Sequence, residues 1–239
     1  MTELVDWCCD LLSCMRVDLD GATKEPIAAM QHLHGAYGIS RFCMMPLLDA
    51  TIDPVNLFLL KRNAYERMLF AELPKDVLIT FSARVLLRPE LFSVTDLEKL
   101  TVVTNGYLPI ALPICEYDDW IDLALNRLLY KRKCKLLLTA CEQYPILYPS
   151  EAVEKLFRIP GAVYQFGYDA LVQPQTRRLI YNLIRNKRSV LFGTAINSLH
   201  AAWSFDLRHY ESSARELIPE AELEKSFHFG LDFWNTCLI

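Results

Sequence analysis

Histidine and cysteine are the first residue types to test for chemistry in this chain. Its five histidines include one close pair, His32 and His34. The surrounding apolar residues follow helical spacing, and residues two apart on a helix point about 200° away from each other. None of the eight cysteines forms a C-x-x-C pair, and none is followed six residues later by arginine. A converging histidine pair, a zinc ribbon and a cysteine-based phosphate loop are therefore not expected, and a nucleophilic Cys141 stays as an alternative to buried, reduced thiols.

Two aspartates, Asp18 and Asp20, form a second candidate in the stretch MRVDLDGAT (15–23). The Asp-x-Asp-Gly pattern after an apolar run resembles the first motif of the haloacid dehalogenase-like phosphatases. That resemblance implies Asp18 as nucleophile and Asp20 as acid, with magnesium held between them. However, Arg16 interrupts the apolar approach, and no later predicted strand ends in the acidic pair that the family requires. An enzyme of this kind is therefore kept as an alternative.

Composition narrows the classes of protein that these residues can serve. The chain has 239 residues, of which 52% are hydrophobic, with a formal net charge of −4 and a pI of about 5.8. Its apolar runs are far shorter than the roughly 20 residues of a membrane-spanning helix, and its start lacks the basic region of a signal peptide. We expect a cytoplasmic protein with no membrane span and no nucleic-acid partner.

The candidate residues have to be positioned by alternating strands and helices. Apolar, β-branched runs predict strands at 8–15, 40–45, 77–83, 106–112, 135–140, 163–166 and 189–193. Helical spacing predicts helices within 54–72, 117–133 and 175–187, and two more within 207–231. This alternation is typical of an α/β protein with parallel strands. We expect a single domain over 1–239, with a barrel at about 8–200 and peripheral C-terminal helices at about 207–231.

Seven segments at or near the predicted strand ends carry a family resemblance. They are CDLLSCMRVDLDGA (9–22), GISRFCMMPLLD (38–49), SARVLLRPEL (82–91), YLPIALP (107–113), LLLTACEQY (136–144), GAVYQFGYDAL (161–171) and LFGTAINS (191–198). In order and spacing they resemble the motifs of the PHP-type (polymerase and histidinol phosphatase) tyrosine phosphatases of bacterial capsule and exopolysaccharide operons, the CpsB/YwqE type. The resemblance implies a distorted (β/α)7 barrel with three divalent metals, usually manganese, at the carboxyl ends of its strands.

The departures from that pattern fall on the metal ligands. The histidine, aspartate and glutamate ligand positions correspond here to Leu11, Ser13, Leu47, Leu48, Arg84, Ala111, Ala140, Thr194 and Ile196. None of these offers a carboxylate or an imidazole, which divalent metals need. We expect no bound metal and no catalytic residues at these vestigial positions. Arg84 could instead meet an anion, or pair with a nearby carboxylate such as Glu142.

The resemblance, with these losses, predicts a catalytically degenerate phosphatase homologue that acts by binding or regulation. Its implied partners are a tyrosine kinase, a phosphotyrosine tail or an active family phosphatase, and a homo-oligomer is possible. The alternative is an active phosphatase. It would be either a diverged PHP-type enzyme or the haloacid dehalogenase-like enzyme using Asp18 and Asp20.

Overall fold

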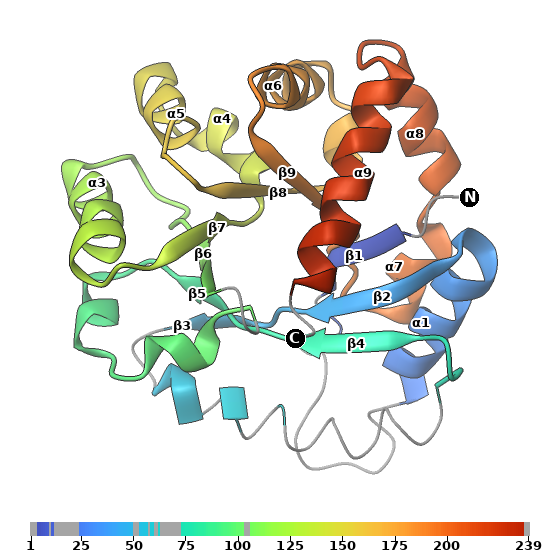
Figure 1. Cartoon of the computed structure of the whole chain (residues 1–239), viewed down its shortest axis with the longest axis horizontal. Coiled ribbons are helices and arrows are strands. Elements are labelled where there is room, and N and C mark those ends of the chain that lie inside the picture. Colours follow the sequence, from blue (N-terminus) through green and yellow to red (C-terminus); the bar gives the residue numbers. More distant parts are fainter. Residues whose placement is uncertain are drawn as a thin grey trace.

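Parallel strands alternating with helices build the fold, which confirms the predicted α/β class (Figure 1). The computed structural model describes residues 4–9, 11, 24–49, 53–56, 58–59, 62, 73–102 and 106–236. Its strands are β1 (Leu4–Cys9), β2 (Ile39–Met44), β3 (Leu47–Asp49), β4 (Leu78–Phe81), β5 (Arg84–Leu86), β6 (Tyr107–Ala111), β7 (Lys135–Leu138), β8 (Val163–Gly167) and β9 (Ser189–Gly193). Its α-helices are α1 (Lys24–Tyr37), α3 (Asp119–Asn126), α4 (Tyr144–Leu147), α5 (Ser150–Leu156), α6 (Pro174–Arg185), α7 (Leu199–Ser204), α8 (Leu207–Arg215) and α9 (Glu220–Asn235).

Two strands of the barrel are each interrupted by a bend, so that each appears as two short strands. Sheet order is β1-β2-β4 in one sheet and β3-β5-β6-β7-β8-β9 in the other. Only Met45 and Pro46 separate β2 from β3, and only two residues separate β4 from β5. Backbone hydrogen bonds from Ser82 to Met44 (2.9 Å) and from Arg84 to Pro46 (3.0 Å) carry the pairing across both bends. The nine described strands therefore occupy seven barrel positions, because two pairs each form one interrupted strand.

A close contact between β1 and β9 closes the ring. The Ala195 amide, just after β9, donates to the Cys8 carbonyl at 2.8 Å. At the end of β9, a Cβ atom on Gly193 would lie 2.4 Å from the Cys8 backbone nitrogen. Only a residue without a side chain allows the two backbones to approach this closely. The seam thus depends on the glycine at the end of β9.

The inner side of the ring of strands is filled by an apolar cluster that is separate from the main hydrophobic core. β1, β2, β7, β8 and β9 all contribute side chains to it, and the end of α9 adds Phe233 and Trp234. Trp7 of β1 contacts the Phe233 ring edge-on at a centroid distance of 5.0 Å, and its indole N–H donates to the Gly230 carbonyl at 3.2 Å. Figure 1 shows α9 running toward β1 and the centre of the ring. The end of the C-terminal helix is therefore part of the barrel core.

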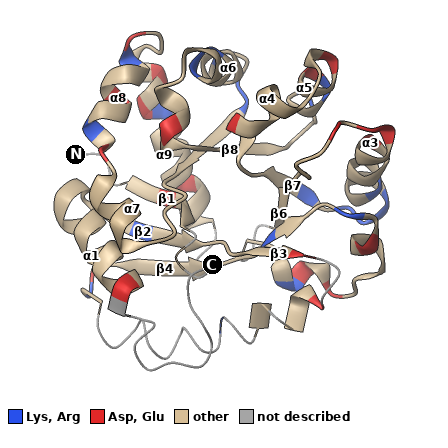
Figure 2. Ribbon diagram, turned by 180° about the vertical axis from the view of Figure 1, so that it is seen from behind, with Lys and Arg blue, Asp and Glu red and all other residues tan. Residues whose placement is uncertain are grey.

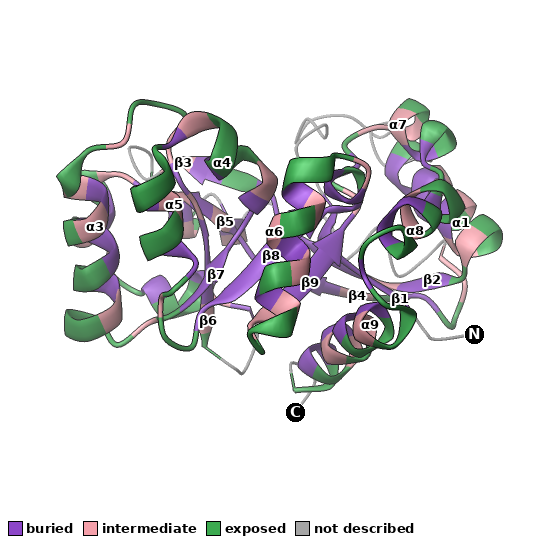
Figure 3. Cartoon of the chain, turned by 90° about the horizontal axis from the view of Figure 1, so that it is seen from above, coloured by how far each residue is buried: buried purple, intermediate pink, exposed green. Residues whose placement is uncertain are grey.

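The remaining helices cover the outside of the strands, with buried residues facing inward and exposed residues facing out (Figure 3). α6, for example, buries Ile180 and Leu183 while Arg178 and Arg185 are exposed. In the part of the chain that the structure describes, no helix combines the length and apolar character needed to cross a bilayer. The helices predicted within 117–133, 175–187 and 207–231 are confirmed, whereas much of 54–72 lies outside the described residues.

The first strand was predicted wrongly. The run 8–15 was expected to form it, but β1 spans Leu4–Cys9 and Leu11 lies in a turn, while residues 10 and 12–15 lie outside the described residues. The error arose because the apolar residues Leu11 and Leu12 extend the hydrophobic run beyond the strand, while Asp6 interrupts it inside. The three-residue strands β3 and β5 were not predicted as separate strands. Each is short and follows a bend, and so short a run has no distinct period in the sequence.

Candidate functional site: the carboxyl ends of the strands

The turn after β7 is built on an alanine in an unusual backbone conformation. Ala140 lies in the left-handed region, with φ 54° and ψ 43°, and is followed by the short 3-10 helix Cys141–Gln143. Its amide donates to the side-chain oxygen of Gln165 at 3.0 Å, and the Gln165 amide group donates to the Phe166 carbonyl at 2.8 Å. Gln165 of β8 therefore holds this turn in place, and the methyl group at position 140 presents no ligand atom.

Cys141 has no nucleophilic character in this setting. Its side chain is fully buried, and its thiol donates to the Leu138 carbonyl at 3.2 Å. Burial raises the pKa of the Cys141 thiol well above its usual value, and the neighbouring Glu142 raises it further. The neutral thiol is favoured, so a catalytic thiolate at this position is not supported.

A carboxylate, Glu142, lies at the strand ends in the 3-10 helix after β7. One Glu142 oxygen accepts a hydrogen bond from the Gly167 amide at 3.0 Å. Burial raises the pKa of Glu142, Asp169 also raises it, and Arg84 lowers it together with the backbone hydrogen bonds. The guanidinium of Arg84, at the start of β5, therefore acts electrostatically on Glu142 near the end of β7. Among these influences burial is the largest, and Arg84 is one of three that lower the pKa of Glu142.

The raised pKa of Glu142 predicts a specific pH dependence. Its ordinary value is 4.5, and the folded protein binds its proton more tightly than the unfolded chain does. The stability that this residue contributes is therefore complete at low pH and is lost as the pH rises through the folded pKa. We expect Glu142→Gln to gain stability relative to the wild type as the pH rises above 4.5. Urea unfolding of both proteins at several pH values above 4.5 measures the difference in their free energies of unfolding. A difference that does not change with pH would contradict the prediction.

Asp6 and Thr194 form a second polar cluster, at the seam between β1 and β9. One carboxylate oxygen of Asp6 accepts from the Thr194 amide at 2.8 Å and from the Cys8 amide at 3.2 Å, and the other accepts from the Thr194 hydroxyl. The hydroxyl oxygen in turn accepts from the Ile196 amide at 3.2 Å. Burial raises the pKa of Asp6, which the hydrogen bonds from Thr194, Cys8 and Cys9 partly oppose. The Thr194 hydroxyl is thus committed to closing the barrel.

The other candidate positions are apolar and differ in exposure. Leu11, Leu48 and Ile196 are buried, Ala111 is half-buried, and Leu47 is exposed. Ser13, Asp18 and Asp20 lie outside the described residues. Because β1 ends at Cys9, Leu11 lies just past the end of this strand.

These residues do not fit a divalent metal cluster. Of the nine predicted positions, the described ones offer alkyl groups, one threonine hydroxyl bonded to Asp6 and the positive charge of Arg84. Glu142 already accepts from the Gly167 amide. Among residues 4–9, 11, 24–49, 53–56, 58–59, 62, 73–102 and 106–236, no three His, Cys, Asp or Glu side chains gather in a way that could hold a metal ion. The donor chemistry that manganese prefers is therefore missing from the described strand ends.

Sequence reasoning missed two residues that organise the site. Asp6 was not singled out, although a lone aspartate within the apolar run LVDWCC is a signal for a buried, hydrogen-bonded carboxylate. Gln165 was noted only as a motif match, yet it lies fully inside the strand VYQFG. When a strand is buried along its whole length, a polar side chain within it indicates either a structural hydrogen bond or a functional site.

The seam, the split strands and the polar strand ends define a seven-position parallel α/β barrel of the PHP type. No family model matches the sequence, and no curated protein matches it. A chain from the crystal structures of YwqE from Bacillus subtilis and CpsB from Streptococcus pneumoniae, described as unique metal-dependent tyrosine phosphatases, has the same fold. The TM-score is 0.62 with 14% sequence identity, covering 92% of this chain and 90% of that one. The predicted distorted barrel is thereby confirmed.

Proposed function

We propose that this protein is a catalytically degenerate homologue of the metal-dependent tyrosine phosphatases and acts by binding. The observation that carries the proposal is the set of side chains at the described strand ends, which offer alkyl groups, a Thr194 hydroxyl bonded to Asp6 and the positive charge of Arg84. By the resemblance, position 84 would hold a ligand glutamate in an active family member. An arginine at this position repels a divalent cation. Its own positive charge takes the place of the charge that a metal ion would supply near Glu142.

The polar groups that remain at the strand ends support the same proposal, because they are engaged with one another. Glu142 accepts from Gly167, Gln165 bridges Ala140 and Phe166, and Thr194 is bonded to Asp6. A phosphatase of this class needs metal ions to activate water and to clamp the phosphoryl oxygens. The partners we propose are a phosphotyrosine tail, a tyrosine kinase or an active family phosphatase in a mixed oligomer, in a capsule or exopolysaccharide system.

Two measurements on the purified protein test this proposal. After incubation with manganese and desalting, elemental analysis is expected to find no stoichiometric metal. Phosphate release from a phosphotyrosine peptide is expected to stay at the level of the blank with manganese, magnesium, zinc or no metal. Retained manganese, or metal-dependent release, would overturn the proposal.

An Asp18→Asn variant separates the alternative enzymes. Magnesium-dependent release that disappears in Asp18→Asn would identify the haloacid dehalogenase-like reaction. Metal-dependent release that survives the substitution would identify a diverged PHP-type phosphatase. Under the proposed function the variant and the wild type are both inactive.

A further inference from the structure

One side of the barrel carries a set of basic side chains that the strand ends do not use. They come from the three connections that enter β7, β8 and β9, and from α9. We call them the basic rim: Lys131, Arg132, Lys133, Lys135, Arg158, Arg185, Lys187, Arg188 and Lys225. All are exposed except Arg188, which is half-buried. Because β7, β8 and β9 are parallel neighbours, the three connections lie on the same side of the barrel, opposite the strand ends described above.

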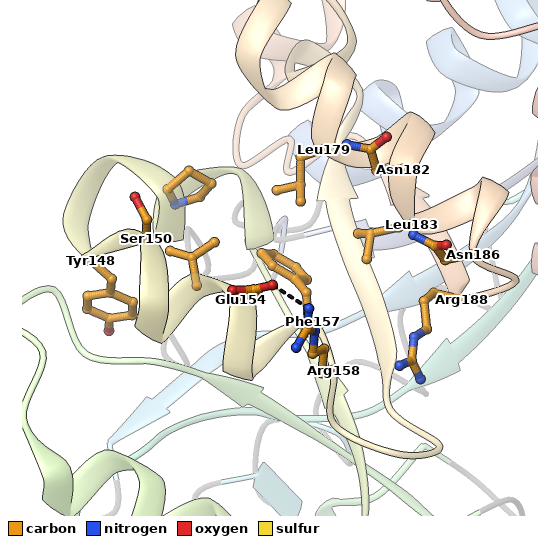
Figure 4. A pocket seen from close by; sticks show the side chains of 12 residues that line it. Tyr148, Ser150, Glu154, Phe157, Arg158, Leu179, Asn182, Leu183, Asn186 and Arg188 are labelled. Atoms are coloured by element: carbon orange, nitrogen blue, oxygen red, sulfur yellow. Dashed lines mark hydrogen bonds and ion pairs between the residues drawn. The ribbon is translucent and has the colours of Figure 1, made fainter.

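Three grooves between helices border part of the basic rim. The groove between α3 and α5 is lined by Tyr130 and Arg158. The groove between α5 and α6, with a volume of about 890 Å³, is lined by Arg158 and Arg188, and Figure 4 shows both arginines at the same end of it. A third groove, of about 630 Å³ between α6 and α9, is lined by Arg185, Lys187, Arg188 and Lys225. The second and third grooves share Arg188 and so connect the members from Arg158 to Lys225. Figure 2 shows blue segments before β7 and at the end of α6.

Most of this charge has no carboxylate partner in the described structure. Arg158 pairs with Glu154, Lys225 pairs with Glu222, and Arg132 donates to the Val94 carbonyl. Lys135 lies over the Tyr107 ring at 5.4 Å. No ion pair joins any other member to an acid among the described residues; those members are Lys131, Lys133, Arg185, Lys187 and Arg188. A cluster of exposed like charges without counter-ions is electrostatically unfavourable in the isolated protein.

Helix-end stabilisation explains only part of the basic rim. Basic residues in the last helical turn interact well with the helix dipole, which accounts for Lys131 and Arg185. Lys133 and Lys187, however, lie beyond their helices with φ values of 54° and 57°. Glycine is the residue that favours this left-handed conformation after a helix. Two equivalent turns therefore carry lysine where glycine would be more stable, which points to a use for the charge.

We propose that the basic rim docks this protein on an anionic membrane surface as a peripheral protein. Outside the rim, 16 of the 25 Lys and Arg remain against 29 Asp and Glu, so the rest of the molecule is strongly acidic. A planar membrane meets only the face turned toward it, because charges beyond a Debye length of about 8 Å are screened. Tyr130, adjacent to Lys131 and 71% exposed, supplies an aromatic side chain of the kind found at headgroup level.

The overall charge and the small number of exposed aromatic residues make nucleic acid a less favoured ligand of the basic rim. Nucleic-acid-binding domains are usually basic overall, with a pI above about 9, and single-strand binders add several aromatic stacking platforms. This chain has a pI of about 5.8, and Tyr130 is the one exposed large aromatic that borders the rim among the described residues.

Co-sedimentation with phosphatidylcholine vesicles, with and without phosphatidylglycerol, tests the proposal. The wild type is expected to bind only the vesicles that contain phosphatidylglycerol, and to be released by added salt. The Lys133→Gly/Lys187→Gly variant is expected to bind about 30-fold more weakly, at roughly fivefold per lysine. Its thermal midpoint should rise, because glycine relieves both strained turns, so the loss of binding cannot be a loss of folding.

Two controls complete the experiment. Lys133→Arg/Lys187→Arg keeps the charge and is expected to bind like the wild type, as is Lys75→Gly, which removes an exposed lysine outside the rim. The proposal is overturned if the wild type ignores anionic vesicles, binds both vesicle types equally, or is unaffected by the double glycine variant. Capture of a short DNA duplex in preference to the vesicles, with the same sensitivity to the glycine pair, would also overturn it and identify nucleic acid as the ligand.

Discussion

Gly193→Ala is expected to destabilise the protein by about 3 kcal/mol, because a new methyl group would be forced into the backbone of β1. The added Cβ would lie 2.4 Å from the Cys8 nitrogen and 2.7 Å from its Cβ. Neither atom belongs to the far end of a flexible side chain, so relief requires β1 and β9 to separate. Denaturant unfolding followed by circular dichroism would measure the loss as a lower midpoint.

Gly35→Ala is the matched control for this prediction. Gly35 lies in α1, is exposed, and has no neighbouring atom within 4 Å of the position of an added Cβ. Alanine is the better helix former, so this variant is expected to gain about 0.5–1 kcal/mol. If the two substitutions shifted the unfolding midpoint equally, the seam between β1 and β9 would not be the tight contact described above.

Asp6→Ala is the second substitution with a large expected effect, a loss of about 3–5 kcal/mol. It removes the acceptor for the buried Thr194 and Cys8 amides and for the Thr194 hydroxyl. Asp6→Asn keeps the oxygen that receives both amides and can donate to the hydroxyl, so it is expected to cost about 1 kcal/mol or less.

A double-mutant cycle shows whether the loss passes through Thr194. Thr194→Val removes the hydroxyl and leaves the backbone amide. The coupling between Asp6→Ala and Thr194→Val is expected to lie at about 0.5–3 kcal/mol, as for residues in direct contact. Strict additivity would show that the carboxylate acts mainly through the backbone amides. Equal stability of Asp6→Asn and Asp6→Ala would contradict the hydrogen-bonded role of Asp6 altogether.

Much of the fold could be predicted because its strands are buried and its helices amphipathic. β7, β8 and β9 fall where apolar runs were expected, and α6 follows its helical period almost residue for residue. The bends at Pro46 and Ala83 could not be predicted, because strand pairing across them is decided by neighbouring strands. The bounds of β1 were lost for a related reason: Asp6 is tolerated inside the strand only because Thr194, 188 positions away, satisfies it.

In the candidate site too, some features follow from local sequence and others depend on contacts between distant segments. The resemblance predicts which positions lack metal ligands, since that depends on residue type alone. What occupies the space instead depends on contacts between distant segments. The bond between Gln165 and the Ala140 amide, and the effect of Arg84 on Glu142, join segments that lie far apart in the sequence.

Under the proposed function, the charges of Arg84 and Glu142 also bear on whether a metal site could form by substitution. A glutamate at position 84 would remove a cation that lowers the pKa of Glu142 and add a carboxylate near Glu142 and Asp169. That intermediate is less stable than its parent, and it still lacks the other ligands needed to capture a metal. Several substitutions would have to arise together before any of them was advantageous. Under the proposed function, Arg84 therefore disfavours the single substitution Arg84→Glu, because that change adds a carboxylate close to Glu142 and Asp169.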